Sequence, residues 1–260
     1  MLPILLLRDP DHPSPVVKAA LESAVGASNV EEAAPTRDNF PAVLDRLRSG
    51  EAAGAYVLGK LRVDAAQAAS RYFTVSDSLG VANAIKGPKD VYGTNTEGDG
   101  FLMPIKDVEP ATALILGAGT GARMAATALL KAGWRVKVWN RTMTRSRGMG
   151  IALQRAGKVE LVPEPEPGRC RLVVNATLLG ARPGETPPVV WERASPHTIA
   201  YDLVWRERVP TDFLRAASRR GFATVDGRES IIGATALALA WIQGQMPDLE
   251  KMRAAVFEAV

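Results

Sequence analysis

A glycine-rich turn between two apolar runs constrains the fold of this chain more than any other feature. The apolar run 113–116 leads into a turn of the form G-x-G-x-x-A, made by Gly117, Ala118, Gly119, Thr120, Gly121 and Ala122. A helix-forming run follows, and a second apolar run begins at Arg135. In such a turn the first glycine permits the tight bend, the second lets the backbone approach a phosphate, and a small third residue lets helix and strand pack closely. The pattern predicts the strand–turn–helix–strand unit that begins a Rossmann domain.

The residues after the second strand indicate which dinucleotide such a turn binds. The predicted strand Arg135–Trp139 is followed by Asn140, Arg141, Thr142 and Arg145. A site that prefers NAD has Asp or Glu here, which accepts hydrogen bonds from the ribose hydroxyl. Guanidinium groups instead form charge-assisted hydrogen bonds with a 2′-phosphate, which a carboxylate would repel. We therefore predict a site for NADP(H); the alternative is a basic surface loop after a strand.

Composition excludes several other classes of protein. The net charge is +4 and the basic residues are scattered, which gives no sign of nucleic-acid binding and fits an enzyme that handles anions. The single cysteine, Cys170, excludes an intrachain disulfide and indicates a reducing, cytoplasmic location. With only two histidines, a His/Cys metal site is not expected. No apolar run approaches membrane-spanning length, so we expect no membrane span. We predict a cytoplasmic monomer or homodimer that acts on a small molecule and holds no metal.

Strand and helix patterns alternate along the 260 residues, which predicts an α/β protein with largely parallel sheets. Before the glycine turn we expect strands at 3–7, 54–58, 82–85 and 90–93, and helices at 15–25, 39–49 and 63–72. After it we expect strands at 159–162, 172–174, 198–203 and 223–225, and helices at 231–243 and 247–260. The segment 163–167 alternates proline with glutamate, which predicts a loop.

Four separated motifs, in the same order, make the chain resemble the shikimate/quinate dehydrogenase family. The segment from Gly93 to Phe101 resembles that family's G-x-N-T-D-G-x-G-F. The glycine turn and the segment 140–142 resemble its G-A-G-G-A-A-R and N-R-T. Residues 175–180 are similar to its N-A-T-P-L-G, and residues 201–205 and 226–227 are similar to its Y-D-x-x-Y and D-G.

The resemblance implies an architecture and an activity. Residues 1–106, with the C-terminal helices in 230–260, would form an α/β substrate domain, and residues 107–229 would form the NADP-binding Rossmann domain. Hydride would pass between nicotinamide and a carbonyl or hydroxyl carbon, or an imine or amine carbon, of a small and possibly anionic molecule.

The resemblance also assigns the cofactor half of the site. Asn175, Ala176 and Thr177 would pass under the nicotinamide half of the cofactor, and Leu203 and Gly227 would lie near its ring. With the residues of the turn and of the basic segment, the expected cofactor site comprises Gly117, Gly119, Thr120, Gly121, Ala122, Asn140, Arg141, Thr142, Arg145, Asn175, Ala176, Thr177, Leu203 and Gly227.

The catalytic positions depart from the family pattern, in which a lysine and an aspartate bridge the reacting hydroxyl. An ungapped count from Gly54 puts Arg62 at the lysine and Asn83 at the substrate-binding asparagine. Arginine stays protonated and cannot relay protons, whereas Lys60, two residues away, could replace the lysine if the loop shifts. Glu97 keeps the carboxylate of the aspartate. We predict Glu97 as the proton-handling group, with Lys60 as its second partner and Arg62 binding an anionic group or closing the site.

The substrate-binding positions have changed too. Ser14 matches a serine that binds the substrate carboxylate, but His12 replaces the serine before it. The family's asparagine, threonine, second tyrosine and glutamine are replaced by Tyr56, Leu58, Trp205 and Ala234. We predict a substrate site of Ser14, His12, Asn83 and Trp205 that is more apolar than a shikimate site.

A second hypothesis follows from the same departures. The cofactor half is kept and the lysine is lost, which also fits a catalytically silent relative that senses NADP(H) or serves as a regulatory subunit. The sequence leaves both readings open.

Overall fold

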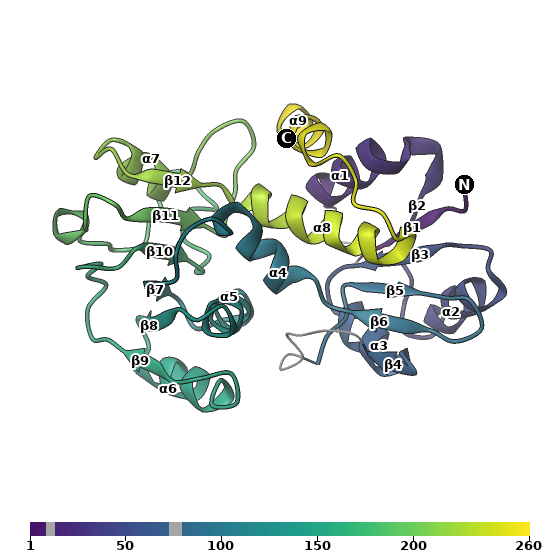
Figure 1. The fold of residues 1–260 in the computed structure, drawn as a ribbon, viewed down its shortest axis with the longest axis horizontal. Coiled ribbons are helices and arrows are strands. Elements are labelled where there is room, and N and C mark those ends of the chain that lie inside the picture. Colours follow the sequence, from purple (N-terminus) through teal and green to yellow (C-terminus); the bar gives the residue numbers. More distant parts are fainter. Residues whose placement is uncertain (9–13, 73–79) are drawn as a thin grey trace. The chain divides into compact units, whose positions relative to one another are not determined.

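A computed structural model of the chain describes residues 1–8, 14–72 and 80–260. Two compact units make up the chain (Figure 1): unit 1 is Met1–Gly100 with Ile231–Val260, and unit 2 is Phe101–Ser230. The boundaries predicted from the sequence lie at 106/107 and 229/230. The chain passes from unit 1 to unit 2 within α4 (Glu97–Leu102) and returns within α8 (Gly227–Gln243).

Unit 1 contains a mixed six-stranded sheet in the order β2-β1-β3-β5-β6-β4. Its strands are β1 (Ile4–Leu7), β2 (Val30–Ala33), β3 (Gly54–Val57), β4 (Arg71–Tyr72), β5 (Ala84–Lys86) and β6 (Tyr92–Thr94). β1 pairs in parallel with β2 and β3, whereas β5 is antiparallel to both β3 and β6. The residues that follow β3 and β6 therefore lie at the same end of the sheet as the residues that precede β5.

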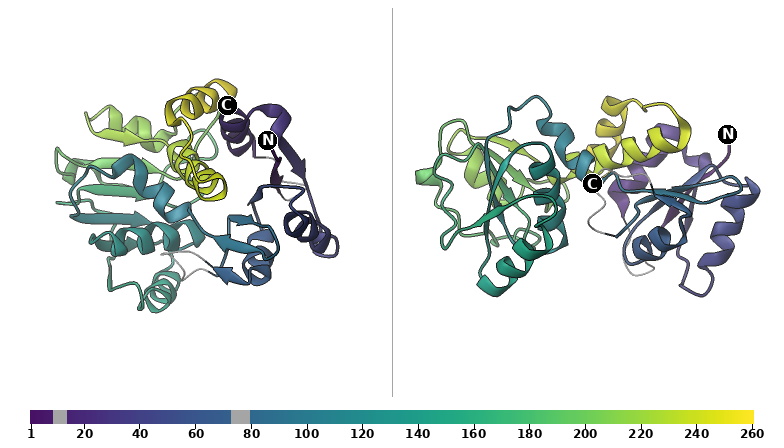
Figure 2. Two further views of the ribbon diagram at one scale, coloured as in Figure 1. Left: turned by 45° about the vertical axis from the view of Figure 1, so that its right-hand side comes forward. Right: turned by 60° about the horizontal axis from the view of Figure 1, so that its bottom comes forward.

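Helices cover both faces of the unit 1 sheet. The side chains of β1 alternate, so that Ile4 and Leu6 pack with α1 (Pro15–Val25) and α8, and Leu5 and Leu7 pack with α2 (Phe40–Ser49) and α3 (Leu61–Ala68). All four residues of β1 are buried, as expected for a strand that lies between two helical layers. The last helix, α9 (Leu249–Ala259), lies beside α1 (Figures 1 and 2).

Unit 2 contains a six-stranded sheet in which every pair is parallel, in the order β12-β11-β10-β7-β8-β9. Its strands are β7 (Thr112–Leu116), β8 (Arg135–Trp139), β9 (Val159–Leu161), β10 (Leu172–Asn175), β11 (Ile199–Asp202) and β12 (Ala223–Val225). The strand order reverses between β7 and β10, which is the Rossmann arrangement, and ligands of such sheets bind at the carboxyl ends of the strands beside this switch point.

The helices of unit 2 lie on both faces of its sheet. The core on one face includes residues of α5 (Thr120–Lys131) and α6 (Met143–Ala152), and the core on the other includes residues of α7 (Asp212–Ser218) and the buried Cys170. Three short 3₁₀ helices, η1 (Ala27–Asn29), η2 (Met103–Ile105) and η3 (Trp191–Arg193), complete the described elements.

The predicted α/β class is confirmed, and most predicted elements differ from the observed ones by a few residues at the ends. One prediction is wrong in part: the helix expected at 63–72 ends at Ala68, and Arg71–Tyr72 pairs in parallel with β6 as β4. Several other elements, among them β2, α4, α6 and α7, were not predicted. β2 is a strand at the sheet edge with two exposed glutamates, and α6 has two glycines and only Ser146 and Met149 buried. Neither segment has the apolar periodicity that marks an element in a sequence.

Within residues 1–8, 14–72 and 80–260, none of the helices combines the length and the hydropathy that crossing a bilayer requires.

Candidate functional site

The glycine turn lies at the carboxyl end of β7, at the switch point of the unit 2 sheet. Gly117 has a φ of 115°, and a Cβ on it would lie 2.7 Å from the carbonyl oxygen of Ala176. Only glycine adopts this φ without strain, and its lack of a side chain brings the turn against the loop after β10. A Cβ on Gly119 would meet no atom within 4 Å, so the backbone there is open to a ligand.

The helix that follows is suited to bind a pyrophosphate. α5 begins at exposed Thr120, and no side chain caps its first N–H groups. Ala122 is buried in the core on this face, which fits its expected role in close helix–strand packing. N–H groups without a side-chain cap, together with the positive end of the helix dipole, are the features that favour an anion next to Gly119.

The basic segment lies beside this turn. The N–H of Gly117 donates to the carbonyl oxygen of Trp139 at 2.8 Å, which joins the ends of β7 and β8. Asn140 follows at once, and its Nδ2 donates to the carbonyl oxygen of Thr142 at 2.8 Å. Arg141 and Arg145 are exposed. The two arginines therefore lie exposed beyond the end of β8, Arg141 before α6 and Arg145 within it.

The loop after β10 is held by the side chain of Asn175. Asn175 is fully buried, and its Nδ2 donates to Asp202 Oδ1 and to the carbonyl oxygen of Leu179, both at 2.8 Å. Its Oδ1 accepts from the N–H of Thr177 at 3.1 Å and from Thr177 Oγ1 at 2.7 Å. The side-chain amide of Asn175 is thus hydrogen-bonded within the protein. A cofactor that binds at this loop would contact the exposed parts of residues 176–179 instead.

Leu203 and Gly227 lie at the same end of the sheet. A Cβ on Gly227 would lie 2.8 Å from the carbonyl oxygens of both Asp202 and Leu203, so only glycine fits there. A Cβ on Gly121 would lie 3.4 Å from Leu203 Cδ1. Unit 2 therefore brings the predicted cofactor residues to one end of its sheet. Trp205, predicted to bind substrate, is partly exposed in the segment after β11.

In unit 1, an ion pair joins two of the three predicted catalytic residues. Arg62 lies in the first turn of α3, and its Nη1 donates to Oε1 of Glu97, the first residue of α4. The two side chains are 23 % and 25 % exposed, so the pair is reachable from solvent. Lys60 is exposed and directly precedes α3. The structure thus brings Arg62 to Glu97, whereas Lys60 is exposed to solvent.

Asn83 lies beside this pair in a buried hydrogen-bond network. Its Nδ2 donates to Thr96 Oγ1 at 2.9 Å and lies 3.4 Å from the Tyr56 hydroxyl, and its Oδ1 accepts from the Thr96 N–H at 2.9 Å. Thr96 Oγ1 donates in turn to the carbonyl oxygen of Ala234 at 2.7 Å. Asn83 is 1 % exposed, so its polar groups are engaged mainly with the protein.

Tyr56 is buried beside this network, with its hydroxyl 3.4 Å from Asn83 Nδ2. Burial raises the pKa of its hydroxyl to about 12, and the negative charge of Glu97 adds to the rise. The phenol is therefore neutral at physiological pH and can act only as a hydrogen-bonding group. Sequence reasoning named Tyr56 as a replacement and missed Thr96, although Thr96 stands within the G-x-N-T motif next to Glu97.

The remaining predicted substrate residues are less informative. Ser14 precedes α1, is partly exposed, and does not cap that helix with its hydroxyl. His12 lies outside the described residues. Ala234 is buried against Gly100, where an added Cβ would lie 2.2 Å from the Ala234 nitrogen. Lys18, exposed on α1, pairs with Glu32 at 3.2 Å.

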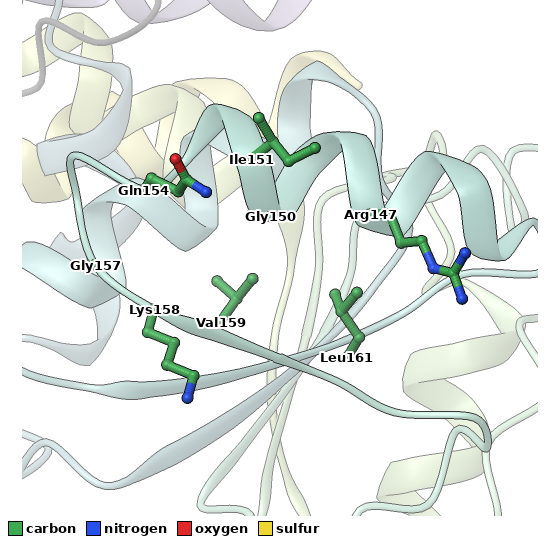
Figure 3. A pocket seen from close by; sticks show the side chains of 8 residues that line it. All are labelled: Arg147, Gly150, Ile151, Gln154, Gly157, Lys158, Val159 and Leu161. Atoms are coloured by element: carbon green, nitrogen blue, oxygen red, sulfur yellow. The ribbon is translucent and has the colours of Figure 1, made fainter.

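Among the described residues, no group of three or more His, Cys, Asp and Glu side chains is arranged to hold a metal ion. A surface hollow of about 520 Å³ lies between α6 and β9 (Figure 3), lined by Arg147, Gly150, Ile151, Gln154, Gly157, Lys158, Val159 and Leu161. None of these is a predicted site residue.

The chain is similar in sequence to known shikimate dehydrogenases. The shikimate dehydrogenase (NADP⁺) of Caulobacter vibrioides is 33 % identical over 251 residues, which span 90 % of this chain and 86 % of that protein. The corresponding protein of Rubrobacter xylanophilus is 35 % identical over 189 residues, which span 68 % of this chain and 66 % of that protein. The chain belongs to the shikimate dehydrogenase family. No protein-family model matches it.

Solved structures agree with this assignment. Shikimate 5-dehydrogenase from Thermus thermophilus, in complex with NADP(H) and shikimate, is 28 % identical and covers 100 % of both chains with a TM-score of 0.84. The ligand-free 5-ketofructose reductase of a Gluconobacter species shares the fold, with a TM-score of 0.87 at 20 % identity. Family membership confirms the predicted two-domain fold and the class of enzyme, an NADP(H)-dependent oxidoreductase. These comparisons give no support to the alternative of a silent sensor.

Proposed function

We propose that this family member interconverts a carbonyl and a hydroxyl group, or an imine and an amine, of a small molecule with NADP(H), and that Arg62 and Glu97 act on the reacting group. The observation that carries the proposal is the ion pair between these two side chains, each about a quarter exposed, at the positions of the family's catalytic pair.

The residues of unit 2 fit the cofactor. We assign the pyrophosphate to the N–H groups at the start of α5, reached over Gly119, and the 2′-phosphate to Arg141 and Arg145. The open space at Gly119 and the exposure of both arginines support this assignment. When bound, NADPH supplies a hydride from nicotinamide C4.

The residues of unit 1 handle the oxygen and its proton. In the oxidation of an alcohol, the Glu97 carboxylate accepts the hydroxyl proton as the hydride leaves carbon, and in reduction the protonated Glu97 returns it to oxygen. Arg62 stays charged throughout, so its role is to orient Glu97 and to donate a hydrogen bond to the substrate oxygen. Lys60, exposed beside α3, remains the candidate for a second proton carrier.

The substrate differs from shikimate in this proposal. The Arg62 charge is balanced by Glu97 and that of Lys18 by Glu32, so these cations offer little to a carboxylate. Tyr56, Leu58 and Ala234 offer fewer polar contacts than the residues that the family pattern expects there. An anionic substrate would depend on Ser14 and His12, and that character remains a prediction, as do the cytoplasmic location and the oligomeric state.

The test is NADPH oxidation with a panel of ketones, imines and 3-dehydroshikimate. We expect turnover of at least one compound, and a fall of about 10²–10⁴-fold in kcat for Glu97→Gln, the range for a positioned acid–base group. Lys60→Ala, measured in parallel, separates its contribution from that of Arg62. Tight NADPH binding with no turnover of any compound would instead favour the silent sensor.

The cofactor assignment has its own test. Arg141→Ala should weaken NADPH binding much more than NADH binding, because only NADPH carries the 2′-phosphate. Equal weakening of both would contradict the assignment.

A further inference from the structure

Asp202 is a buried carboxylate in unit 2 with no role in the function proposed above. It ends β11 directly opposite Asn175, which ends β10, in parallel register. The two strands are neighbours in the unit 2 sheet (Figure 1). Both side chains are 0 % exposed. The two therefore meet at the carboxyl end of the sheet, where the loop 175–180 begins.

The carboxylate of Asp202 joins three segments. Its Oδ1 accepts from Asn175 Nδ2 at 2.8 Å and from the Val204 N–H at 3.0 Å. Its Oδ2 accepts from Thr211 Oγ1, the hydroxyl that caps α7. The partners are the loop after β10, the turn after β11 and the start of α7.

These three partners of Asp202 all donate hydrogen bonds, and none of them carries a charge. An ionised carboxylate can accept all three, whereas a protonated one would direct a hydrogen at a donor. Removing the charge therefore weakens the connection between the three segments, even where the shape of the side chain is kept.

Through Asn175 the effect reaches the backbone of the loop. Asn175 accepts from the Thr177 N–H at 3.1 Å and donates to the Leu179 carbonyl at 2.8 Å, and Leu179 N–H donates to Thr177 Oγ1 at 3.0 Å. On the other side, the backbone of Asp202 and Leu203 lies against Gly227. The residues so ordered are those expected at the nicotinamide half of the cofactor.

We propose that Asp202 is a positioning residue for the nicotinamide half of NADP(H), and that its negative charge holds the loop 175–180 in the binding conformation. The proposal rests on the cofactor assignment made above. Asp202 touches neither cofactor nor substrate in this view, and it acts through Asn175 and Val204.

The charge is expected to depend on pH near neutrality. Burial raises the pKa of Asp202 to about 7 against the lowering effect of its three hydrogen bonds, and the charge of Asp226 adds to the rise. The charged groups on the neighbouring elements are themselves paired: Asp226 with Arg228 at 2.9 Å and Asp212 with Arg206 at 3.3 Å. The three hydrogen bonds lower this pKa, so proton uptake by the still buried carboxyl opposes them. Protonation as the pH falls from 8 to 6 should therefore weaken these bonds and, through them, cofactor binding.

The test is NADPH binding by calorimetry for the wild type and Asp202→Asn between pH 6 and 8. At pH 8 we expect the variant to bind about tenfold more weakly, within the range for hydrogen bonds to a charged group. The wild type should lose affinity towards pH 6 more steeply than the variant. The 2′-phosphate titrates in both proteins alike, so the difference between the two curves isolates Asp202.

A second readout needs no cofactor. Amide hydrogen exchange at Thr177 and Leu179 should be faster in Asp202→Asn than in the wild type without nucleotide. Thr198→Val is the matched control, because Thr198 Oγ1 donates to the Cys170 carbonyl at 2.8 Å just before the opposite end of β11. This control should lower stability and leave NADPH affinity unchanged.

The outcomes separate the two proposals. No NADPH binding by the wild type would overturn the cofactor assignment, whereas equal affinity, pH dependence and amide exchange in wild type and Asp202→Asn would overturn only the role of Asp202. If Asp202→Asn fails to fold, Thr211→Val and Thr211→Ser make the same comparison, with affinity expected to fall in the first and to be kept in the second.

Discussion

Replacing Asn83 by leucine tests whether the buried network beside Glu97 is held together by this amide. Leucine has nearly the same size and no polar atoms, so the substitution removes hydrogen bonds with little change in volume. It leaves the Thr96 N–H, which donates to Asn83 Oδ1 at 2.9 Å, without that partner in a residue only 6 % exposed.

The expected cost follows from these contacts. A buried N–H left unpaired costs about 1–3 kcal/mol, and the second short bond, from Asn83 Nδ2 to Thr96 Oγ1 at 2.9 Å, adds about 1 kcal/mol. The contact to Tyr56 at 3.4 Å is too long to add much. We therefore expect a loss of about 3 kcal/mol, which corresponds to a fall in Tm of roughly 6–12 °C for a chain of this length.

Differential scanning calorimetry of Asn83→Leu and the wild type makes this measurement. Asn39→Leu is the matched control, because Asn39 is exposed and its side chain does not cap α2, so its Tm should hardly change. A Tm for Asn83→Leu within about 1 °C of the wild type, together with a raised KM, would refute the reasoning and show Asn83 to be mainly a substrate ligand.

Three further predictions concern other contacts. Urea unfolding of variants that lack Arg62, Glu97 or both should give a coupling energy of about 1 kcal/mol, as for a partly exposed ion pair. If the two single losses of unfolding free energy simply add up in the double variant, the pair contributes nothing to stability. Gly227→Ala should cost about 1–3 kcal/mol, because the new Cβ would lie 2.8 Å from two backbone oxygens, whereas Gly148→Ala, with open space around it, should not destabilise. The pKa of Tyr56 is raised to about 12 in the folded protein, so its contribution to stability is present below pH 10 and is lost as the pH rises towards 12. Tyr56→Phe should therefore flatten the curve of unfolding free energy against pH between 10 and 12. An unchanged curve would contradict the raised pKa.

The sequence predicted the parts of the fold that depend on local pattern. The turn at Gly117 and the strand Arg135–Trp139 could be located because glycine spacing and apolar runs are visible in one dimension. β2 and α6 could not, because β2 exposes two glutamates and α6 contains two glycines that lower its helix propensity. Both are held by neighbouring strands and helices rather than by their own pattern.

The candidate site was predictable as a set of positions and less so as a set of contacts. The motif count placed Arg62 and Glu97 at the positions of the family's lysine and aspartate. It could not tell whether Arg62 or Lys60 reaches the Glu97 carboxylate. That depends on the start of α3, where a shift of one residue turns a side chain by about 100° around the helix. Nor could the sequence show that the side-chain amides of Asn83 and Asn175 form hydrogen bonds with neighbouring backbone and side-chain atoms.

The environment of Cys170 has a practical consequence for spectroscopy. The thiol is 2 % exposed, and burial raises its pKa, so little reactive thiolate is present at neutral pH. A maleimide or nitroxide reagent should therefore leave it unmodified, and a cysteine introduced at Leu178, which is 87 % exposed, could be labelled alone. The native thiol need not be removed before attaching a probe that reports how this segment moves as nucleotide is added.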